Sequence, residues 1–159
     1  MRADVDLGLV ARHAVEEMAD AEPGSVLKFD SSGNLHGAWD SARISQVLSN
    51  LLANAVQYGK PKAPISVTVQ GEGEYVLLRV HNDGPPIPKE DIGGLFDALK
   101  HQKSGIVLPE SSRNLGIGLY IAERIVCAHG GAINVSSSIE AGTMFSIRLP
   151  RSPVDSADE

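Results

Sequence analysis

Cysteines, aromatic residues and long apolar runs are all scarce in this chain of 159 residues. The single cysteine, Cys127, excludes a disulfide within the chain and a cysteine-rich zinc site. Aromatic residues make up 4% of the sequence, too few to predict the stacking surfaces that hold single-stranded nucleic acid. No stretch approaches the roughly 18 apolar residues of a transmembrane helix. Residues 1–6 carry three charges and do not resemble a signal peptide. We therefore expect a domain that makes no membrane contact.

Positive charge is also in deficit, because 14 basic residues face 20 acidic ones and the formal net charge is −6. This balance argues against a generally basic nucleic-acid-binding surface. Apolar residues make up 42% of the chain, which is ordinary for a globular protein of a size that can bury its own core. We expect one domain over residues 1–150, followed by a flexible acidic tail over residues 151–159.

Apolar periodicity predicts both helices and strands. Helices are expected over 6–20, 41–58 (capped by Asp40 or Ser41), 115–128 and, more briefly, 90–99. Strands are expected over 26–30, 35–39, 65–69, 76–80, 133–137 and 144–149. The turn residues at 31–34 predict a hairpin between the first two strands. Strand pairs alternate with long helices without a regular βαβ repeat, which favours an α+β fold: a mixed, mostly antiparallel sheet covered by helices on one face.

Two asparagines lie one turn apart on the predicted helix over 41–58. Asn50 and Asn54 fall beside the apolar stripe of this helix, so their neutral amide oxygens can point to one place. Such oxygens suit Mg²⁺, which keeps several waters and also binds substrate phosphates. The alternative interpretation is that both asparagines belong to a solvated helix face.

Two further segments carry candidate ligand-binding chemistry. Asn82 ends a predicted strand and precedes a Gly-Pro loop at residues 83–88, where a polar side chain can bind the edge of a planar ligand, although a simple tight turn explains the same residues. Residues 114–121 carry glycines into a helix start, where free N–H groups favour phosphate. This segment is neither a dinucleotide fingerprint nor a Walker A loop.

Taken together and in this order, the segments resemble the catalytic, ATP-binding domain of bacterial sensor histidine kinases, within the wider GHKL ATPase group. The N box is similar to residues 46–58, the G1 box to 82–88, the F box to 95–97 and the G2 box to 115–119. Residues 128–131 and 142–145 match the family's closing segments, and the resemblance covers about residues 6–151. It implies a Bergerat-type two-layer α/β sandwich that binds ATP and Mg²⁺ and lies in the cytoplasm.

The resemblance also implies roles for individual residues. Asn54 would hold Mg²⁺, with Asn50 assisting at the metal or the phosphates, and these two are the candidate catalytic residues. Asn82 would read the adenine amino group. Residues 97–114 would form the ATP lid. The remaining expected nucleotide contacts are Tyr58, Gly84, Pro86, Ile87, Lys100, Lys103, Arg113, Leu115, Gly116, Ile117, Gly118, Leu119 and Thr143.

Several positions depart from the family pattern, and three of them leave an alternative open. Asn82 replaces the usual Asp, Pro86 replaces the second G1 glycine, and Asn114 replaces the first G2 glycine. These departures suggest the alternative of a nucleotide-binding or degenerate interaction module that performs no phosphotransfer.

The residue at position 50 separates the chemistries of this group. Its ATPases place a Glu there to activate water, and an amide cannot accept a proton near neutral pH. Hydrolysis by that route is therefore disfavoured, whereas phosphoryl transfer to a histidine mainly needs positioning and charge neutralisation. None of the five histidines stands in the family's phosphoacceptor context: His13, His36, His81, His101 and His129. We expect a monomeric catalytic fragment whose partners are a separate phosphoacceptor domain and, downstream, a response regulator; His129 is expected to cap its helix.

Overall fold

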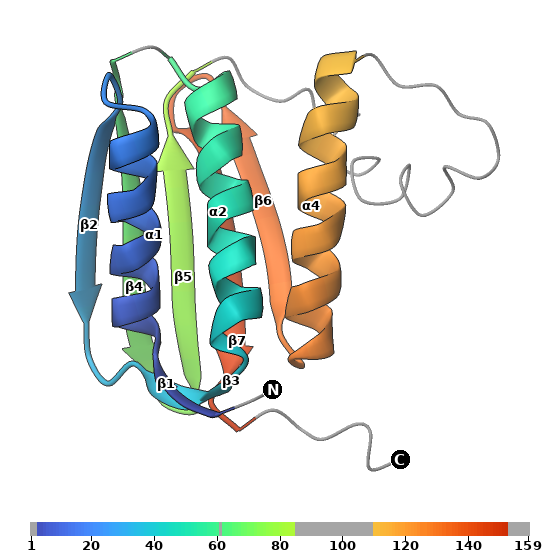
Figure 1. Cartoon of the computed structure of the whole chain (residues 1–159). Helices are drawn as coiled ribbons and strands as arrows, with labels where there is room; N and C mark the ends of the chain where they lie inside the picture. The colour runs from blue at the N-terminus through green and yellow to red at the C-terminus, as the bar shows by residue number, and fades with distance from the viewer. Residues whose placement is uncertain (1–2, 61, 85–109, 153–159) are drawn as a thin grey trace, which may run out of the picture.

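Two layers make up the protein in the computed structural model, which describes residues 3–60, 62–84 and 110–152 (Figure 1). One layer is a five-stranded sheet, and the other consists of α1 (Leu7–Ala21), α2 (Ser41–Tyr58) and α4 (Glu110–Ala128), side by side on one face of the sheet. The predicted α+β class, with helices on one face, is confirmed. None of the helices in these ranges is long and apolar enough to cross a membrane.

The sheet has the order β2-β4-β5-β7-β6. Only the pairing of β2 (Val26–Ser32) with β4 (Pro64–Glu72) is parallel, and β5 (Tyr75–Asn82), β7 (Gly142–Pro150) and β6 (Ala132–Ser138) continue it in antiparallel fashion. The hairpins β4–β5 and β6–β7 are those expected from the sequence. Their strands extend one to three residues beyond the predicted ends because the ladder continues into the turns.

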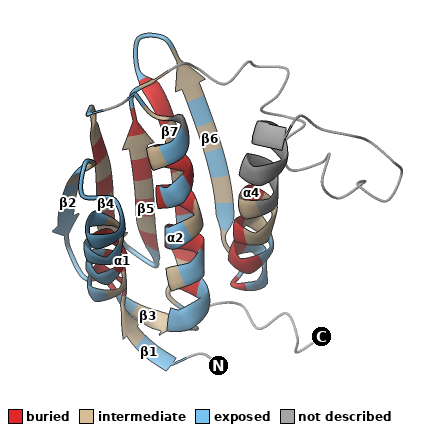
Figure 2. Ribbon diagram, turned by 45° about the horizontal axis from the view of Figure 1, so that its top comes forward, coloured by how far each residue is buried: buried red, intermediate tan, exposed pale blue. Residues whose placement is uncertain are grey.

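The core lies between the sheet and the helices, and its pattern follows from strand alternation. Val76, Leu78 and Val80 are buried while the residues between them are not, and Figure 2 shows this alternation along the central strands. The next inward position of β5 is Asn82, and the first such position of β7 is Thr143. The helix-facing side of the sheet is therefore apolar along most of its length and polar at one end.

The predicted hairpin between the strands over 26–30 and 35–39 is wrong. β2 pairs with β4 instead, and β3 (His36–Trp39) pairs with β1 (Ala3–Asp6), a short strand that the sequence analysis missed. The reason lies in burial, because Leu35 and Trp39 are both part of the hydrophobic core. The indole Nε1 of Trp39 also donates to the carbonyl oxygen of Pro150 at 2.9 Å. Long-range anchoring of β3 therefore outweighs the local turn signal.

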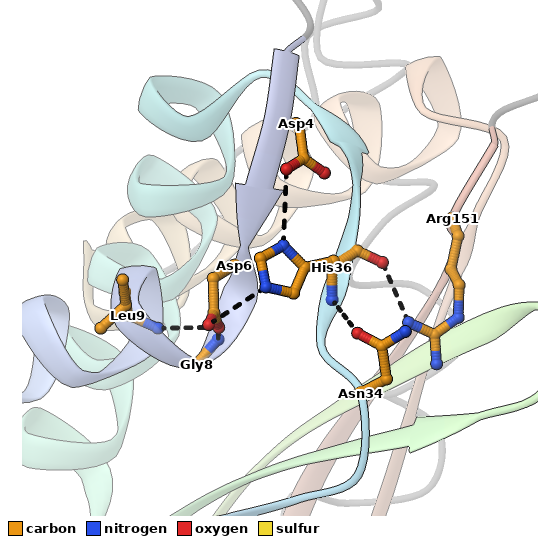
Figure 3. Close-up of polar contacts among 7 residues, drawn as sticks. All are labelled: Asp4, Asp6, Gly8, Leu9, Asn34, His36 and Arg151. Carbon is orange, nitrogen blue, oxygen red and sulfur yellow. Dashed lines mark hydrogen bonds and ion pairs between the residues drawn. The ribbon is translucent and has the colours of Figure 1, made fainter.

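Arg151 was expected to begin the flexible tail, and this is also wrong. Its Nε donates to the carbonyl oxygen of Gly73 at 2.7 Å. Its Nη1 donates to the carbonyl oxygen of His36 at 2.9 Å (Figure 3). Its carbonyl oxygen accepts from the backbone N–H of Ala38. Arg151 thus joins β3 to the β4–β5 turn. Residues 153–159, the rest of the predicted tail, lie outside the described residues.

The N-terminal edge of α4 also differs from the prediction. The helix was expected from Leu115, but it begins at Glu110. Residues 110–114 of the expected ATP lid are therefore helical. The rest of the lid, and the expected helix over 90–99, lie outside the described residues.

Candidate functional site

The two asparagines of α2 face α4. The Nδ2 of Asn50 donates to the carbonyl oxygen of Gly118 at 3.3 Å. Asn54 is only 7% exposed. A β-carbon at position 118 would lie 3.7 Å from the Cβ of Asn50 and 4.0 Å from the Nδ2 of Asn54. Gly118 therefore lies against both amides, and the alternative of a fully solvated helix face does not hold.

The amide of Asn54 is buried, and its Nδ2 has no hydrogen-bond partner among the residues that the structure describes. Such a group costs about 1–3 kcal/mol, and native structures rarely retain one without a reason. A ligand bound at this point would supply the missing partner. The described residues contain no cluster of three or more His, Cys, Asp or Glu side chains that could hold a metal. Amide oxygens beside a phosphate-bearing substrate fit Mg²⁺, and they do not fit zinc.

A second polar pair lies at the same end of the molecule, on the sheet. Asn82 and Thr143 are direct cross-strand partners, only 6% and 5% exposed. The Nδ2 of Asn82 donates to the carbonyl oxygen of Asp83 at 3.3 Å. The Oγ1 of Thr143 lies 2.7 Å from the Oγ of Ser137 on β6. Ser137 was not among the expected site residues, although strand alternation over 133–137 could have placed it on the inner face.

The end of α2 is held against this polar pair. The backbone N–H of Lys60 donates to the carbonyl oxygen of Asp83 at 2.6 Å. A β-carbon at Gly59 would lie 3.2 Å from the Nδ2 of Asn82. Because Gly59 follows Tyr58 directly, the last turn of α2 meets the end of β5. The structure therefore brings Asn54 and Asn82 toward the same end of the sheet.

The remaining expected residues fall into four groups. Gly84 follows β5 with a φ of 153°, a conformation that other residues rarely adopt. Leu119 is fully buried in the core, so its side chain is a packing residue. Tyr58 is the last residue of α2, and Arg113, Leu115, Gly116 and Ile117 lie in the first turns of α4. Pro86, Ile87, Lys100 and Lys103 lie outside the described residues.

The protein is thus an α+β domain with a polar site between α2, α4 and one end of the sheet. Comparison with known proteins identifies its family. The family model described as "Histidine kinase-, DNA gyrase B-, and HSP90-like ATPase" matches residues 39–153. The chain belongs to this family, whose shared role is ATP binding.

Individual relatives narrow the comparison to sensor kinases. The chain is 34% identical to a bacteriophytochrome of Pseudomonas aeruginosa, over 92% of this chain and 20% of that protein. It is 33% identical to the signal transduction histidine-protein kinase AfsQ2 of Streptomyces coelicolor, over 82% of this chain and 23% of that protein. The chain thus spans about a fifth of the length of these relatives.

Solved structures agree with this assignment. The catalytic domain of histidine kinase ThkA superposes with a TM-score of 0.81 and 25% identity, over 96% of this chain and 97% of that chain. Full-length ShkA in complex with AMPPNP superposes with a TM-score of 0.76 and 26% identity, over 96% of this chain and 32% of that chain. The chain is homologous to the catalytic domains of sensor histidine kinases.

Proposed function

We propose that this chain binds Mg-ATP between α2, α4 and the Asn82 end of the sheet, and transfers the γ-phosphoryl group to a histidine on a separate phosphoacceptor domain. The observation that carries the proposal is the buried Nδ2 of Asn54, which has no hydrogen-bond partner among the described residues, beside the Asn50–Gly118 contact. The similarity to a histidine kinase structure in complex with AMPPNP supports nucleotide binding by this chain.

In this proposal, the residues of α2 would bind the phosphate end of the nucleotide and those of the sheet would bind the adenine. Asn54, with Asn50, would hold Mg²⁺, which supplies charge neutralisation at the phosphates when bound. Asn82 would accept from the adenine amino group through its amide oxygen, since its Nδ2 already donates to Asp83. Thr143, held by Ser137, would support the base from the neighbouring strand.

Phosphoryl transfer requires little acid–base chemistry from the residues of this chain. A ring nitrogen of the acceptor histidine attacks the γ-phosphorus, the bond to the β–γ bridging oxygen breaks, and ADP leaves. The chain's contribution is to orient the triphosphate and exclude water from the attacking position. Asn50 cannot act as a base toward water, because a neutral amide accepts no proton near neutral pH. This favours transfer over the hydrolysis typical of the family's ATPases.

Calorimetric titration with ATP and ADP, with and without Mg²⁺, tests nucleotide binding by the chain. Transfer of labelled γ-phosphate to the phosphoacceptor domain of the longer protein then tests the chemistry. We expect Mg-dependent transfer that Asn54→Ala abolishes and that Ser49→Ala, an exposed position on the same helix, leaves intact. Binding without transfer supports an interaction module, and steady phosphate release by the chain alone supports an ATPase. We also propose that the chain is monomeric and that a response regulator acts downstream of the phosphoacceptor domain.

A further inference from the structure

The N-terminus of α2 has an incomplete local cap. Asp40 is the N-cap residue, and its Oδ1 accepts from the backbone N–H of Arg43 at 3.2 Å. In a complete capping box, the residue at position 43 would be Glu or Gln and would accept from the N–H of Asp40 in return. Arg43 carries no acceptor atom and cannot do this. The second half of the cap must therefore come from elsewhere.

That missing acceptor is supplied by the far end of α4. The backbone N–H of Asp40 donates to the Nε2 of His129 at 3.2 Å. The Nδ1 of His129 lies 2.9 Å from the carbonyl oxygen of Ile125, which can only accept. The tautomer that satisfies both contacts carries its proton on Nδ1 and presents Nε2 as the acceptor toward α2. His129 is only 4% exposed, so this contact is sheltered from water.

Both partners of this contact are held firmly from the other side. Asp40 follows the fully buried Trp39, whose indole donates to Pro150 on β7. On the side of α4, Gly131 packs so closely on the carbonyl oxygen of Arg148 that a β-carbon would not fit there. The His129–Asp40 contact thus joins two segments of the chain that are each anchored on β7.

Helices α2 and α4 are consequently tied at two levels along their shared length (Figure 1). Toward one end, Asn50 donates to Gly118 within the candidate nucleotide site. At the other end, His129 accepts from Asp40. The separation between the asparagines of α2 and Gly118 of α4 depends on how α4 is seated along its whole length.

We propose that His129 is a positioning residue for the nucleotide site: it completes the cap of α2 across the helix interface and so seats α4 against Asn50 and Asn54. This inference rests on the proposed function, because it assigns the contact a consequence for ATP affinity. It extends the expected role of His129, which was only to cap its own helix.

Restoring the capping box within α2 distinguishes a positioning role of His129 from a purely stabilising one. Arg43 is exposed, and Arg43→Glu would let residue 43 accept from Asp40, as in an ordinary capping box. We would compare wild type, His129→Ala, Arg43→Glu and the double variant by thermal denaturation and by titration with Mg-ATP. His129→Gln is the conservative control, since its amide oxygen can still accept from Asp40.

We expect His129→Ala to lower the melting temperature and to weaken Mg-ATP binding about tenfold, the scale of one lost buried hydrogen bond. The double variant should recover thermal stability but keep the weakened affinity. His129→Gln should stay within about threefold of wild type. Recovery of affinity in the double variant, or unchanged affinity in His129→Ala, would overturn the inference.

Failure of the proposed function has a different signature, which is absence of Mg-ATP binding by the wild-type chain. Hydrogen exchange without nucleotide then tests the tie directly. In the double variant, the amides of α4 should exchange faster than in Arg43→Glu, while those of the first turn of α2 should not. Equal exchange in α4 would show that His129 does not seat this helix.

Discussion

The side-chain amide of Asn50 donates its hydrogen bond to the carbonyl oxygen of Gly118, 3.3 Å away across the interface between α2 and α4. The position at which the family's ATPases are expected to carry a water-activating acid is therefore used here as a contact between two helices. A donor is required at this point, since a backbone carbonyl faces it. Replacement by a carboxylate would change both the contact and its dependence on pH.

Asn50→Asp should destabilise the fold at neutral pH by about 1–2 kcal/mol, because an ionised carboxylate would face the Gly118 carbonyl. Ionisation is disfavoured in the folded state, so the introduced carboxyl has a folded pKa above its unfolded value. The variant is therefore nearest to wild type below the unfolded pKa of about 3.9, and it loses stability as pH rises through the folded value. Urea denaturation at several pH values measures this, with exposed Ser49→Asp as the charge-matched control. A deficit that does not vary with pH would contradict the prediction.

Asn54→Ala should separate stability from function. Removing a buried amide whose Nδ2 has no partner in the described part of the chain should leave the free energy of unfolding unchanged or raise it by up to about 1 kcal/mol. Mg-dependent nucleotide binding should fall by at least about tenfold, because the amide oxygen is lost with it. Chemical denaturation and calorimetry on the same preparation give both values. A large loss of stability would mean that Asn54 has a structural role that the contacts do not reveal.

Gly118→Ala should stabilise α4 while weakening the site. The added methyl would meet Asn50 at 3.7 Å, an ordinary packing distance, and alanine is about 0.5–1 kcal/mol better than glycine inside a helix. The same methyl would occupy the space between Asn50 and Asn54, so nucleotide affinity should fall. Thermal denaturation and titration with Mg-ATP test the two effects. Unchanged affinity would place the bound nucleotide away from Gly118.

Arg151→Ala should affect stability alone. The side chain joins β3 to the β4–β5 turn, and its loss should cost about 1–2 kcal/mol, or several degrees in melting temperature. Nucleotide affinity should not change, because Arg151 follows the end of β7 opposite to Thr143. Ser152→Ala, at the exposed neighbouring position, serves as the control. A change in affinity would show that this end of the sheet communicates with the site.

Local signals were enough to predict most elements of the fold. The helix over 41–58 was predicted with its observed bounds, because a capping Asp40 and an apolar stripe are both written in adjacent residues. Glycine-rich turns likewise predicted the β4–β5 and β6–β7 hairpins. The strand that pairs with β2 was not predictable in this way, since the turn residues at 31–34 do not indicate that Trp39 and Leu35 are buried in the core.

For the site, the sequence by itself determined which residues we propose to carry the chemistry: Asn50, Asn54, Asn82 and Thr143, by type and by their order along the chain. Only the tertiary structure decided how they are held. Asn50 meets Gly118 across 68 positions of sequence, and Asp40 meets His129 across 89. Such contacts form only once the sheet has brought α2 and α4 together, because burial of the shared core, rather than any local preference, sets the distance between these helices.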